Sequence, residues 1–395
     1  MRQRLRFLWV LFGLSVASLV RAAVPAGDSL RVSLLTCGPG EEAYSVYGHT
    51  AIRVQDQRTG EDWVFNYGVF DFDRPHFIWR FVLGQTDYQL GVMPFEPFVT
   101  SYAHEGRSVE EDVLDLSAAE KERLYLLLLD NFRPQNRVYR YNFFTKNCTT
   151  QARDIIEQAT GGQFVYPAEE PLTYRNVLHR YTARQPWLRF GQDLLVGAEA
   201  DRQLDTRGQD FVPLLYQRDL KRAAIRQPDG SQRPAVSKTV RWAEQRAGGD
   251  APTLLTPMAV LGSAFVLAVV VTLVQILLRR NWWWVDAPFL AVQGLAGCLV
   301  AFLFFFSEHP GVDSNWLLAV LNPLPLLYLP REMQRARRRA RDLYHPVALA
   351  VIWGFTLLHP LTGQAVPTEA LLFLNGVAAL SVARILLAYL NNKHE

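Results

Sequence analysis

The chain has 395 residues, which is long enough for two domains, and a formal net charge of only +3. Because the excess positive charge is small and spread along the chain, no nucleic-acid partner is expected. The composition averages two unlike parts, a mixed N-terminal part and a strongly apolar part after Pro257.

Residues 1–23 have the organisation of a secretory signal peptide. Arginines at positions 2, 4 and 6 precede an apolar run at 7–20, and Val20-Arg21-Ala22 offers a small-residue cleavage site. An uncleaved anchor is the alternative. In either case the chain from Val24 onward is expected to be exported.

Apolar and polar residues alternate in several short segments of the exported part. This pattern predicts strands at 29–36, 49–54, 63–67, 87–93 and 108–116, with a short amphipathic helix at 76–83. Ser117 and Glu120 form a capping-box pattern before a helix. The sequence therefore predicts an α+β domain with a small antiparallel sheet and helices packed on it.

The stretch YNFFTKNCTTQARD at 141–154 is the strongest candidate for a reactive site. Asn147 is a good N-cap, and the residues after it have the apolar period of a helix, so Cys148 is expected in the first helical turn. Unpaired N–H groups and the positive end of the helix dipole favour a thiolate there. They can also stabilise an oxyanion.

His49, at the start of a predicted strand, is the candidate base for Cys148. Asn66, on the next strand, is the best-placed residue to orient the imidazole. Tyr47 and Tyr67 are weaker candidates for that role and are expected to contact the substrate. This is a papain-type triad in permuted order, which geometry defines rather than chain order. The alternatives are a structural Cys37–Cys148 disulfide or a buried, inert cysteine.

The four histidines of the exported part suggest neither a metal site nor a cofactor. His49, His76, His104 and His179 are too scattered for a ligand set. Residues 24–200 are expected to form the catalytic domain and residues 201–256 an extension and linker. Within that linker, 226–250 is polar and is expected to be a mobile tether.

Five apolar segments follow Pro257, at 258–278, 288–306, 316–329, 346–358 and 370–390. They predict an all-α transmembrane domain of about five helices at 257–391, although the third and fourth segments are short. Arginines gather after the first segment and between the third and fourth, so these loops are placed in the cytoplasm and the exported domain in the periplasm. Helical spans imply the inner membrane if the source is Gram-negative. Arg384, near the cytoplasmic end, is expected to snorkel.

Four residues with polar groups lie near the expected periplasmic end of the second and third segments, namely His309, Asn315, Trp316 and Asn322. Polar groups at this depth are costly without a purpose. They are candidates for binding a lipid headgroup or another substrate. The alternative is helix capping and hydrogen bonding between helices.

Three stretches, GEEAYSVYGHTAIRV, WVFNYGVFDF and YNFFTKNCTTQARD, resemble the exported domain of the Bacteroides-type lipoprotein N-acyltransferases (Lnb). SEHPGVDSNWLLAVLNPL resembles that family's membrane part. The arrangement is also similar to the permuted NlpC-type fold of lecithin:retinol acyltransferase. His49 and Cys148 occupy the family's catalytic positions, whereas 163–256 matches only loosely.

The resemblance implies transfer of an acyl chain from a phospholipid, through a Cys148 thioester, to the N-terminal amine of a diacylated lipoprotein. The implied partners are thus a phospholipid donor, a diacylated lipoprotein acceptor and the membrane. A cysteine amidase or peptidase acting on peptidoglycan, a phospholipase and a non-catalytic scaffold are the alternatives.

Overall fold

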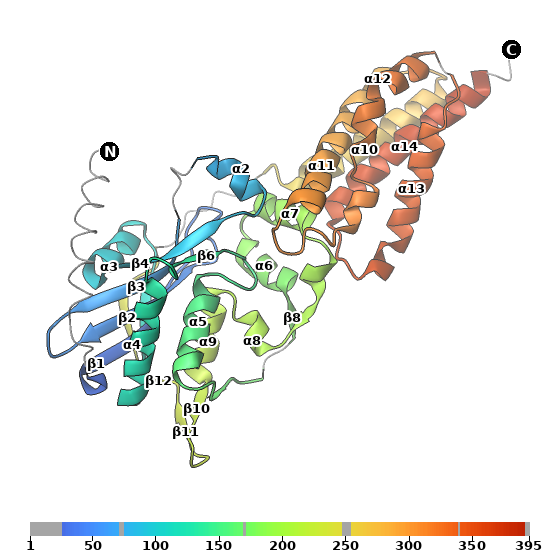
Figure 1. Ribbon diagram of the computed structural model, residues 1–395. Coiled ribbons are helices and arrows are strands. Elements are labelled where there is room, and N and C mark those ends of the chain that lie inside the picture. Colours follow the sequence, from blue (N-terminus) through green and yellow to red (C-terminus); the bar gives the residue numbers. More distant parts are fainter. Residues whose placement is uncertain (1–25, 71–74, 169–170, 247–253, 339, 392–395) are drawn as a thin grey trace.

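The computed structural model describes residues 26–70, 75–168, 171–246, 254–338 and 340–391. The expected signal peptide at 1–23 lies outside these residues. Figure 1 shows two parts, a sheet with helices on it and a bundle of long helices, which meet near α2 and α7. The fold is thus mixed sheet and helix followed by a helical membrane part.

A seven-stranded sheet, in the order β12-β5-β1-β2-β3-β4-β6, forms the centre of the first part. All its strand pairs are antiparallel. The strands are β1 (Leu30–Cys37), β2 (His49–Asp56), β3 (Asp62–Val69), β4 (Asp87–Pro94), β5 (Val109–Leu114), β6 (Val138–Arg140) and β12 (Val236–Ala243). The strands predicted from alternation are therefore confirmed, apart from shifts of a few residues at their ends.

Helices cover both faces of this sheet. On one face, α4 (Ala118–Phe132), α5 (Cys148–Ala159) and α9 (Pro213–Arg222) enclose the main core. On the other face, α3 (Phe95–His104) packs on a smaller core that includes Cys37 and Val64. Both faces are buried because alternate side chains of the central strands point into different cores. The capping box of Ser117 and Glu120 is present at the start of α4.

The prediction of a mobile tether at 226–250 is wrong for most of these residues. Its residues form β11 (Gln232–Pro234), which pairs with β10 (Ala224–Arg226), and β12, which pairs with β5 at the edge of the large sheet. β12 is mostly exposed, so its sequence is polar and lacks the alternation of a buried strand. Of the predicted tether, only 247–250 lies outside the described residues.

A smaller helical unit joins the sheet to the membrane part. It contains α6 (Tyr174–Thr182), α7 (Pro186–Leu195) and α8 (Thr206–Gln209), with the paired short strands β8 (Leu172–Thr173) and β9 (Gln203–Leu204). The short strand β7 (Phe164–Val165) pairs instead with β10. Its apolar core includes Phe144, Tyr174 and Phe211. Phe144 precedes Cys148 by four residues, so this core supports the loop that leads to the cysteine.

The membrane part contains α10 (Pro257–Leu277), α11 (Asp286–Phe306), α12 (Leu324–Arg337), α13 (Tyr344–Leu358) and α14 (Thr368–Asn391). Among the described residues, four helices are long and apolar enough to cross a membrane, and α12 is not one of them. The predicted third span is instead a short 3-10 turn, Trp316–Ala319, followed by α12. Pro323 lies between the two pieces as the N-cap of α12, and Pro325 is in the first turn of α12, where proline is tolerated.

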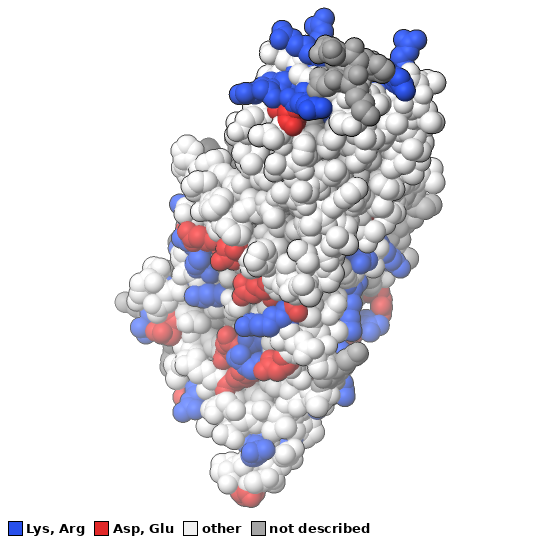
Figure 2. Space-filling model, turned by 90° about the vertical axis from the view of Figure 1, so that its right-hand side faces the viewer, with Lys and Arg blue, Asp and Glu red and all other residues white. Residues whose placement is uncertain are grey.

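Charged side chains are distributed as membrane insertion requires. Figure 2 shows a cluster of basic side chains at the tip of the bundle and mixed charges over the sheet-containing part, with a broad uncharged zone between them. The arginines of α12 and those after α10 lie at the tip, on the side away from the sheet. Since basic loops remain in the cytoplasm, the sheet-containing part lies in the periplasm.

The prediction that the Arg384 side chain reaches out to the cytoplasmic surface is wrong. Its side chain is buried inside the bundle, where it forms an ion pair with Asp286. The guanidinium also donates to Gln275 Oε1 at 2.7 Å and to Asn281. A buried charge is stable when a partner and further hydrogen bonds replace water, and here three side chains do so.

Candidate active site

Cys148 is the first residue of α5, as predicted. Oδ1 of the N-cap Asn147 accepts hydrogen bonds from the backbone N–H groups of Thr149 (2.8 Å) and Thr150 (3.0 Å). Nδ2 of Asn147 donates to the carbonyls of Phe143 and Phe211, which fixes the cap to the loop and to the neighbouring helical unit. The start of α5 is therefore rigid. In the described part of the chain, the N–H of Cys148 itself has no acceptor.

His49 begins β2, opposite Cys37 of β1. Its Nε2 and the Oδ1 of Asn66 on β3 are 2.6 Å apart. Since a carboxamide oxygen only accepts, Nε2 carries the proton and Nδ1 is left to face the sulfur of Cys148. Tyr102 of α3 stacks beside the ring, with centroids 6.2 Å apart and an interplanar angle of 11°. The structure thus brings together the three residues predicted to be catalytic.

The charges of Cys148 and His49 stabilise each other. Burial raises the pKa of the Cys148 thiol, but the facing His49, the Thr50 N–H and the Thr149 hydroxyl outweigh it, and the pKa is lowered overall. Burial lowers the pKa of His49, but the thiolate of Cys148 and the bond to Asn66 outweigh this, and the pKa is raised overall. The pair therefore favours thiolate and imidazolium, the form in which a cysteine is nucleophilic.

Gly68 lies beside both Cys148 and His49. A Cβ at this position would lie 3.7 Å from both Cys148 Cβ and His49 Cε1, and the residue has φ +93°. The register of β3 with β4 shifts between Asn66 and Val69, so Gly68 belongs to an irregular, bulged segment. Such bulges re-aim side chains near active sites. Sequence analysis missed Gly68, and the glycine after Asn66-Tyr67 is the signal that could have revealed it.

Aromatic side chains form a wall beside Cys148 that the sequence analysis also missed. Tyr88 of β4 stacks on Tyr141 with ring centroids 4.3 Å apart, and Phe70 stacks on Tyr88 at 5.0 Å. Burial and the nearby Cys148 charge raise the pKa of Tyr88 to about 12. These rings give the thiolate an apolar neighbourhood suited to an acyl chain. The alternation of β4 predicts one buried face but not which side chains reach the cysteine.

The two tyrosines predicted beside the triad differ in position. Tyr47 is buried and its hydroxyl accepts a hydrogen bond from Gln192 of α7 at 2.6 Å. Tyr67 is 2% exposed, belongs to the main core, and accepts from Asn131 of α4. Because Tyr67 alternates with Asn66, its side chain points into the core, so a substrate contact by Tyr67 is not supported. For Tyr47 the contact stays a prediction.

The three cysteines, Cys37, Cys148 and Cys298, are free thiols. Cys37 is fully buried in the core under α3, and burial raises its pKa far above the ordinary value of a thiol. The structural Cys37–Cys148 disulfide, the main alternative to catalysis, is therefore absent. The two thiols have opposite environments, since only Cys148 faces an imidazole that lowers its pKa.

The four residues proposed to bind substrate from the membrane part occupy different places. Nδ2 of Asn315 donates to the carbonyls of Leu194 and Leu195, and its Oδ1 accepts from Leu317 N–H and Gln364. These bonds fasten α7 to the membrane part and use the polar atoms of the carboxamide. Trp316 is 54% exposed and bonds to Gln364 only through its backbone.

Asn322 was expected at the periplasmic end and lies deeper. A Cβ on Gly297, near the middle of α11, would meet the Asn322 backbone at 2.3 Å, because the chain turns inward after Trp316. Its side chain caps α12 by accepting from the Leu324 N–H at 3.1 Å. This favours the capping alternative over a headgroup contact for Asn322.

His309 lies at the junction between the two parts. Its Nε2 donates to the Phe81 carbonyl at 2.7 Å, and burial lowers its pKa. It also lines a polar cavity of about 240 Å³ together with Asn142 and Arg202. A substrate contact by His309 remains a prediction, and this cavity is where such a contact would occur.

Several direct contacts hold the periplasmic part on the membrane part. Arg140, at the end of β6, pairs with both Asp87 and Glu308. A Cβ on Gly84, which has φ +71°, would meet the His309 nitrogen at 2.5 Å, so the backbones approach closely there. Tyr141, in the wall beside Cys148, follows Arg140 directly. The site is therefore anchored to the membrane part.

The short helix α2 (Phe77–Val82) lies at the same junction and exposes large apolar side chains. Ile78 and Trp79 are 78% and 58% exposed. Trp79 lies 5.5 Å from Phe302 of α11, measured between ring centroids. An apolar helix next to the end of a span fits the membrane surface.

Comparison with known families matches residues 22–180 to the Lnb N-terminal periplasmic domain and residues 250–393 to the Lnb transmembrane domain. No curated protein and no solved structure matches the chain. The two matches cover most of the chain in the expected order and agree with the orientation of the basic loops. The chain therefore belongs to the Lnb family and is a multi-pass membrane protein with a periplasmic domain.

Proposed function

We propose that this protein is a thiol acyltransferase that acylates the N-terminal amine of diacylated lipoproteins through a Cys148 thioester. Membership of the Lnb family suggests lipoprotein N-acylation. The observation that carries the mechanism is the placement of Cys148 beside His49, whose Nε2 is held by Asn66 at 2.6 Å. This Cys-His-Asn arrangement supports a permuted papain-like domain.

In the first half-reaction, the Cys148 thiolate attacks the ester carbonyl carbon of a phospholipid. The carbonyl oxygen takes the negative charge, and the N–H of Cys148 is the donor available to it at the start of α5. The ester C–O bond then breaks, and the leaving oxygen takes the proton from the His49 imidazolium. The products are a lysophospholipid, a Cys148 thioester and neutral His49.

In the second half-reaction, the amine of the lipoprotein attacks the thioester carbon. Neutral His49 accepts a proton from the nitrogen, the C–S bond breaks, and the sulfur leaves as a thiolate. The product is an amide, and the thiolate–imidazolium pair is restored. Asn66 touches neither substrate in this scheme and acts as a positioning residue for the ring.

The surroundings of Cys148 support a lipid substrate over a soluble one. Tyr88 and Tyr141 stack on each other near Cys148. The loop before Cys148 is held on the membrane part by the Arg140–Glu308 pair. Water competes with the amine for the thioester, so an apolar wall and a nearby bilayer favour transfer over hydrolysis. A soluble peptidoglycan substrate would not need this attachment.

The test uses the full-length protein in phospholipid vesicles with a synthetic diacylated lipopeptide. Mass spectrometry follows conversion of the lipopeptide amine to an amide and detects acyl-Cys148 before lipopeptide is added. Wild type should form both species, and Cys148→Ser and His49→Ala should form no N-acyl product. Free fatty acid without N-acylation would indicate a phospholipase, and an unaltered rate in Cys148→Ser would overturn the proposal.

A further inference from the structure

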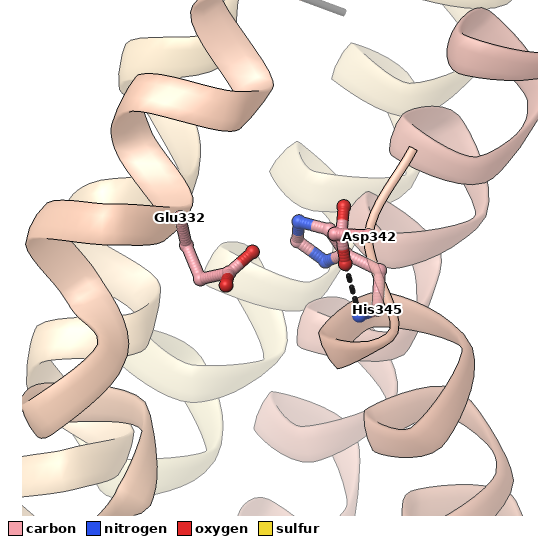
Figure 3. A group of neighbouring side chains, drawn as sticks. All are labelled: Glu332, Asp342 and His345. Carbon is pink, nitrogen blue, oxygen red and sulfur yellow. Dashed lines mark hydrogen bonds between the residues drawn. The ribbon is translucent and has the colours of Figure 1, made fainter. Parts of the chain in front are cut away.

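A second cluster of reactive side chains lies at the cytoplasmic tip of the bundle, far along the chain from Cys148. Glu332 of α12, Asp342 in the following loop and His345 of α13 place one ligand atom each within 4.8 Å of one another. Figure 3 shows the Glu332 carboxylate and the His345 ring facing the space beside Asp342. Glu332 and His345 are only 4% and 2% exposed.

The buried atoms of this cluster lack the partners that burial normally requires. Glu332 Oε2 and His345 Nε2 have no hydrogen-bond partner. Among the described residues, neither Glu332 nor Asp342 forms an ion pair, although Arg331 and Arg335 line the adjoining cavity. Two facing carboxylates repel each other unless a proton or a cation lies between them. A buried imidazole nitrogen without a hydrogen-bond partner is also unfavourable, and a bound cation would remove both costs.

The His345 ring is held in the orientation of a ligand. Its Nδ1 lies 3.2 Å from the hydroxyl of Ser381 on α14. If Nδ1 donates to Ser381, the lone pair of Nε2 points at the carboxylates, which is how an outer hydrogen bond fixes a metal-binding imidazole. Asp342 Oδ1 also accepts a hydrogen bond of 2.9 Å from the backbone N–H of His345. Asp342 and His345 therefore lie in one turn at the start of α13.

We propose that Glu332, Asp342 and His345 bind a divalent transition-metal ion of the zinc class. One imidazole nitrogen and two carboxylate oxygens are a mixed set that suits Zn²⁺ better than Mg²⁺ or Ca²⁺. Ligand atoms around tetrahedral zinc lie roughly 3.3 Å apart. The ligand atoms lie within 4.8 Å of one another, so they need to approach by at most roughly 1.5 Å to reach that spacing.

The site would join α12 to α13 at the cytoplasmic tip. A cavity of about 580 Å³ separates these helices, and Glu332 and Asp342 are among its lining residues. This cavity supplies an entry path and room for a water as the fourth ligand. α12 does not span the membrane by itself, so a metal between its end and α13 would fix its position. The inference stands independently of the proposed acyl transfer.

The test measures zinc binding by the purified full-length protein in detergent, in a Cys148→Ala background that removes the periplasmic thiol as a competing ligand. After chelator treatment, the protein is titrated with Zn²⁺ against a chromogenic chelator, and bound zinc is counted by elemental mass spectrometry. Co²⁺ then reports the coordination geometry through its visible absorption. Glu369→Gln and His359→Gln, outside the cluster, are the matched controls.

The background protein and both controls should bind one zinc per chain. Glu332→Gln and His345→Gln should lower the affinity by at least roughly 100-fold, since loss of a ligand exceeds loss of an outer partner. Zinc should also raise the unfolding temperature of the background protein but not of Glu332→Gln. If His345→Gln fails to fold, Glu332→Gln and Asp342→Asn carry the test.

Two outcomes would overturn the proposal. One is that the background protein binds neither Zn²⁺ nor Co²⁺. If metal-free Glu332→Gln is then more heat-stable than the parent, the two carboxylates share a proton in place of a metal. The other is that the ligand variants bind as much zinc as the controls, which would indicate adventitious binding elsewhere.

Discussion

Asn66 Oδ1 accepts a hydrogen bond of 2.6 Å from Nε2 of His49. This contact joins two neighbouring strands at the point where β3 departs from regular pairing. It selects the tautomer of His49 and directs the opposite nitrogen toward Cys148. In the proposed mechanism, Asn66 therefore acts on Cys148 only through the orientation of His49.

Replacing Asn66 with Ala should lower kcat for N-acylation on the order of 10- to 100-fold with little change in KM, because the imidazole loses its orientation. Asn66→Asp, which keeps an acceptor, should recover part of the loss. The measurement is lipopeptide acylation in vesicles, and Asn136→Ala, on an exposed turn, is the control. An equal loss in Asn66→Ala and Asn66→Asp would show that the residue acts only through folding.

The rate of Cys148 alkylation should depend on pH in a way that reports the ion pair. The pKa of Cys148 is lowered and that of His49 raised, so thiolate persists below the ordinary thiol pKa of 9.0 and is lost as pH falls through the lowered value. His49→Ala removes the main stabilising charge and should move the inflection to higher pH. Iodoacetamide labelling, resolved by peptide mass mapping, separates Cys148 from the other thiols. Superimposable profiles for wild type and His49→Ala would contradict the ion pair.

Cys37 should resist alkylation in the folded protein and react only after denaturation. It is fully buried, and burial raises its pKa, so reagent access and thiolate are both lacking. Cys37→Ala should retain acyl transfer, with a loss of stability of about 1 kcal/mol from the small cavity. Rapid labelling of Cys37 under native conditions would show that β1 opens near its end.

Much of this site could be predicted from local sequence patterns. Ser117 and Glu120 form a capping box that depends on residues three positions apart, and Asn147 with Cys148 depends on adjacent ones. His49 and Asn66 were paired because consecutive strands usually neighbour each other in a sheet. Each of these inferences needs only short-range geometry, and the structure places the residues accordingly.

The missed features depend on contacts that no local pattern encodes. β12 became a strand because β5 offered a free edge more than 100 residues earlier in the chain. The Tyr88–Tyr141 stack joins β4 to the loop after β6. Gly68 of β3 lies beside Cys148 of α5 and His49 of β2. Arg384 looked like a snorkelling residue because its partner, Asp286, lies 98 positions away. Such pairings appear only when the tertiary structure is known.

The apolar face of α2 should help the enzyme take its donor from the bilayer. Ile78→Glu would place a charge where a 78% exposed aliphatic side chain lies beside the membrane part. We expect a higher apparent KM for vesicle phospholipid, with Cys148 alkylation unchanged. Leu126→Glu on α4, an equally drastic change at a residue that is 45% exposed, is the control. If both variants use vesicle lipid as wild type does, α2 does not contact the bilayer.

The Arg384–Asp286 pair should be the main polar contributor to the stability of the bundle. Arg384→Leu leaves the Asp286 carboxylate buried beside apolar helices, and we expect a loss of about 3–5 kcal/mol, with the reverse single change similarly costly. The double variant Asp286→Leu/Arg384→Leu removes both charges and should be more stable than either single variant. Thermal unfolding in one detergent measures this cycle, with the exposed Arg280→Leu as the control. Single and double variants that lose stability additively would mean that the two side chains act independently, and Arg384 would then be held chiefly by Gln275 and Asn281.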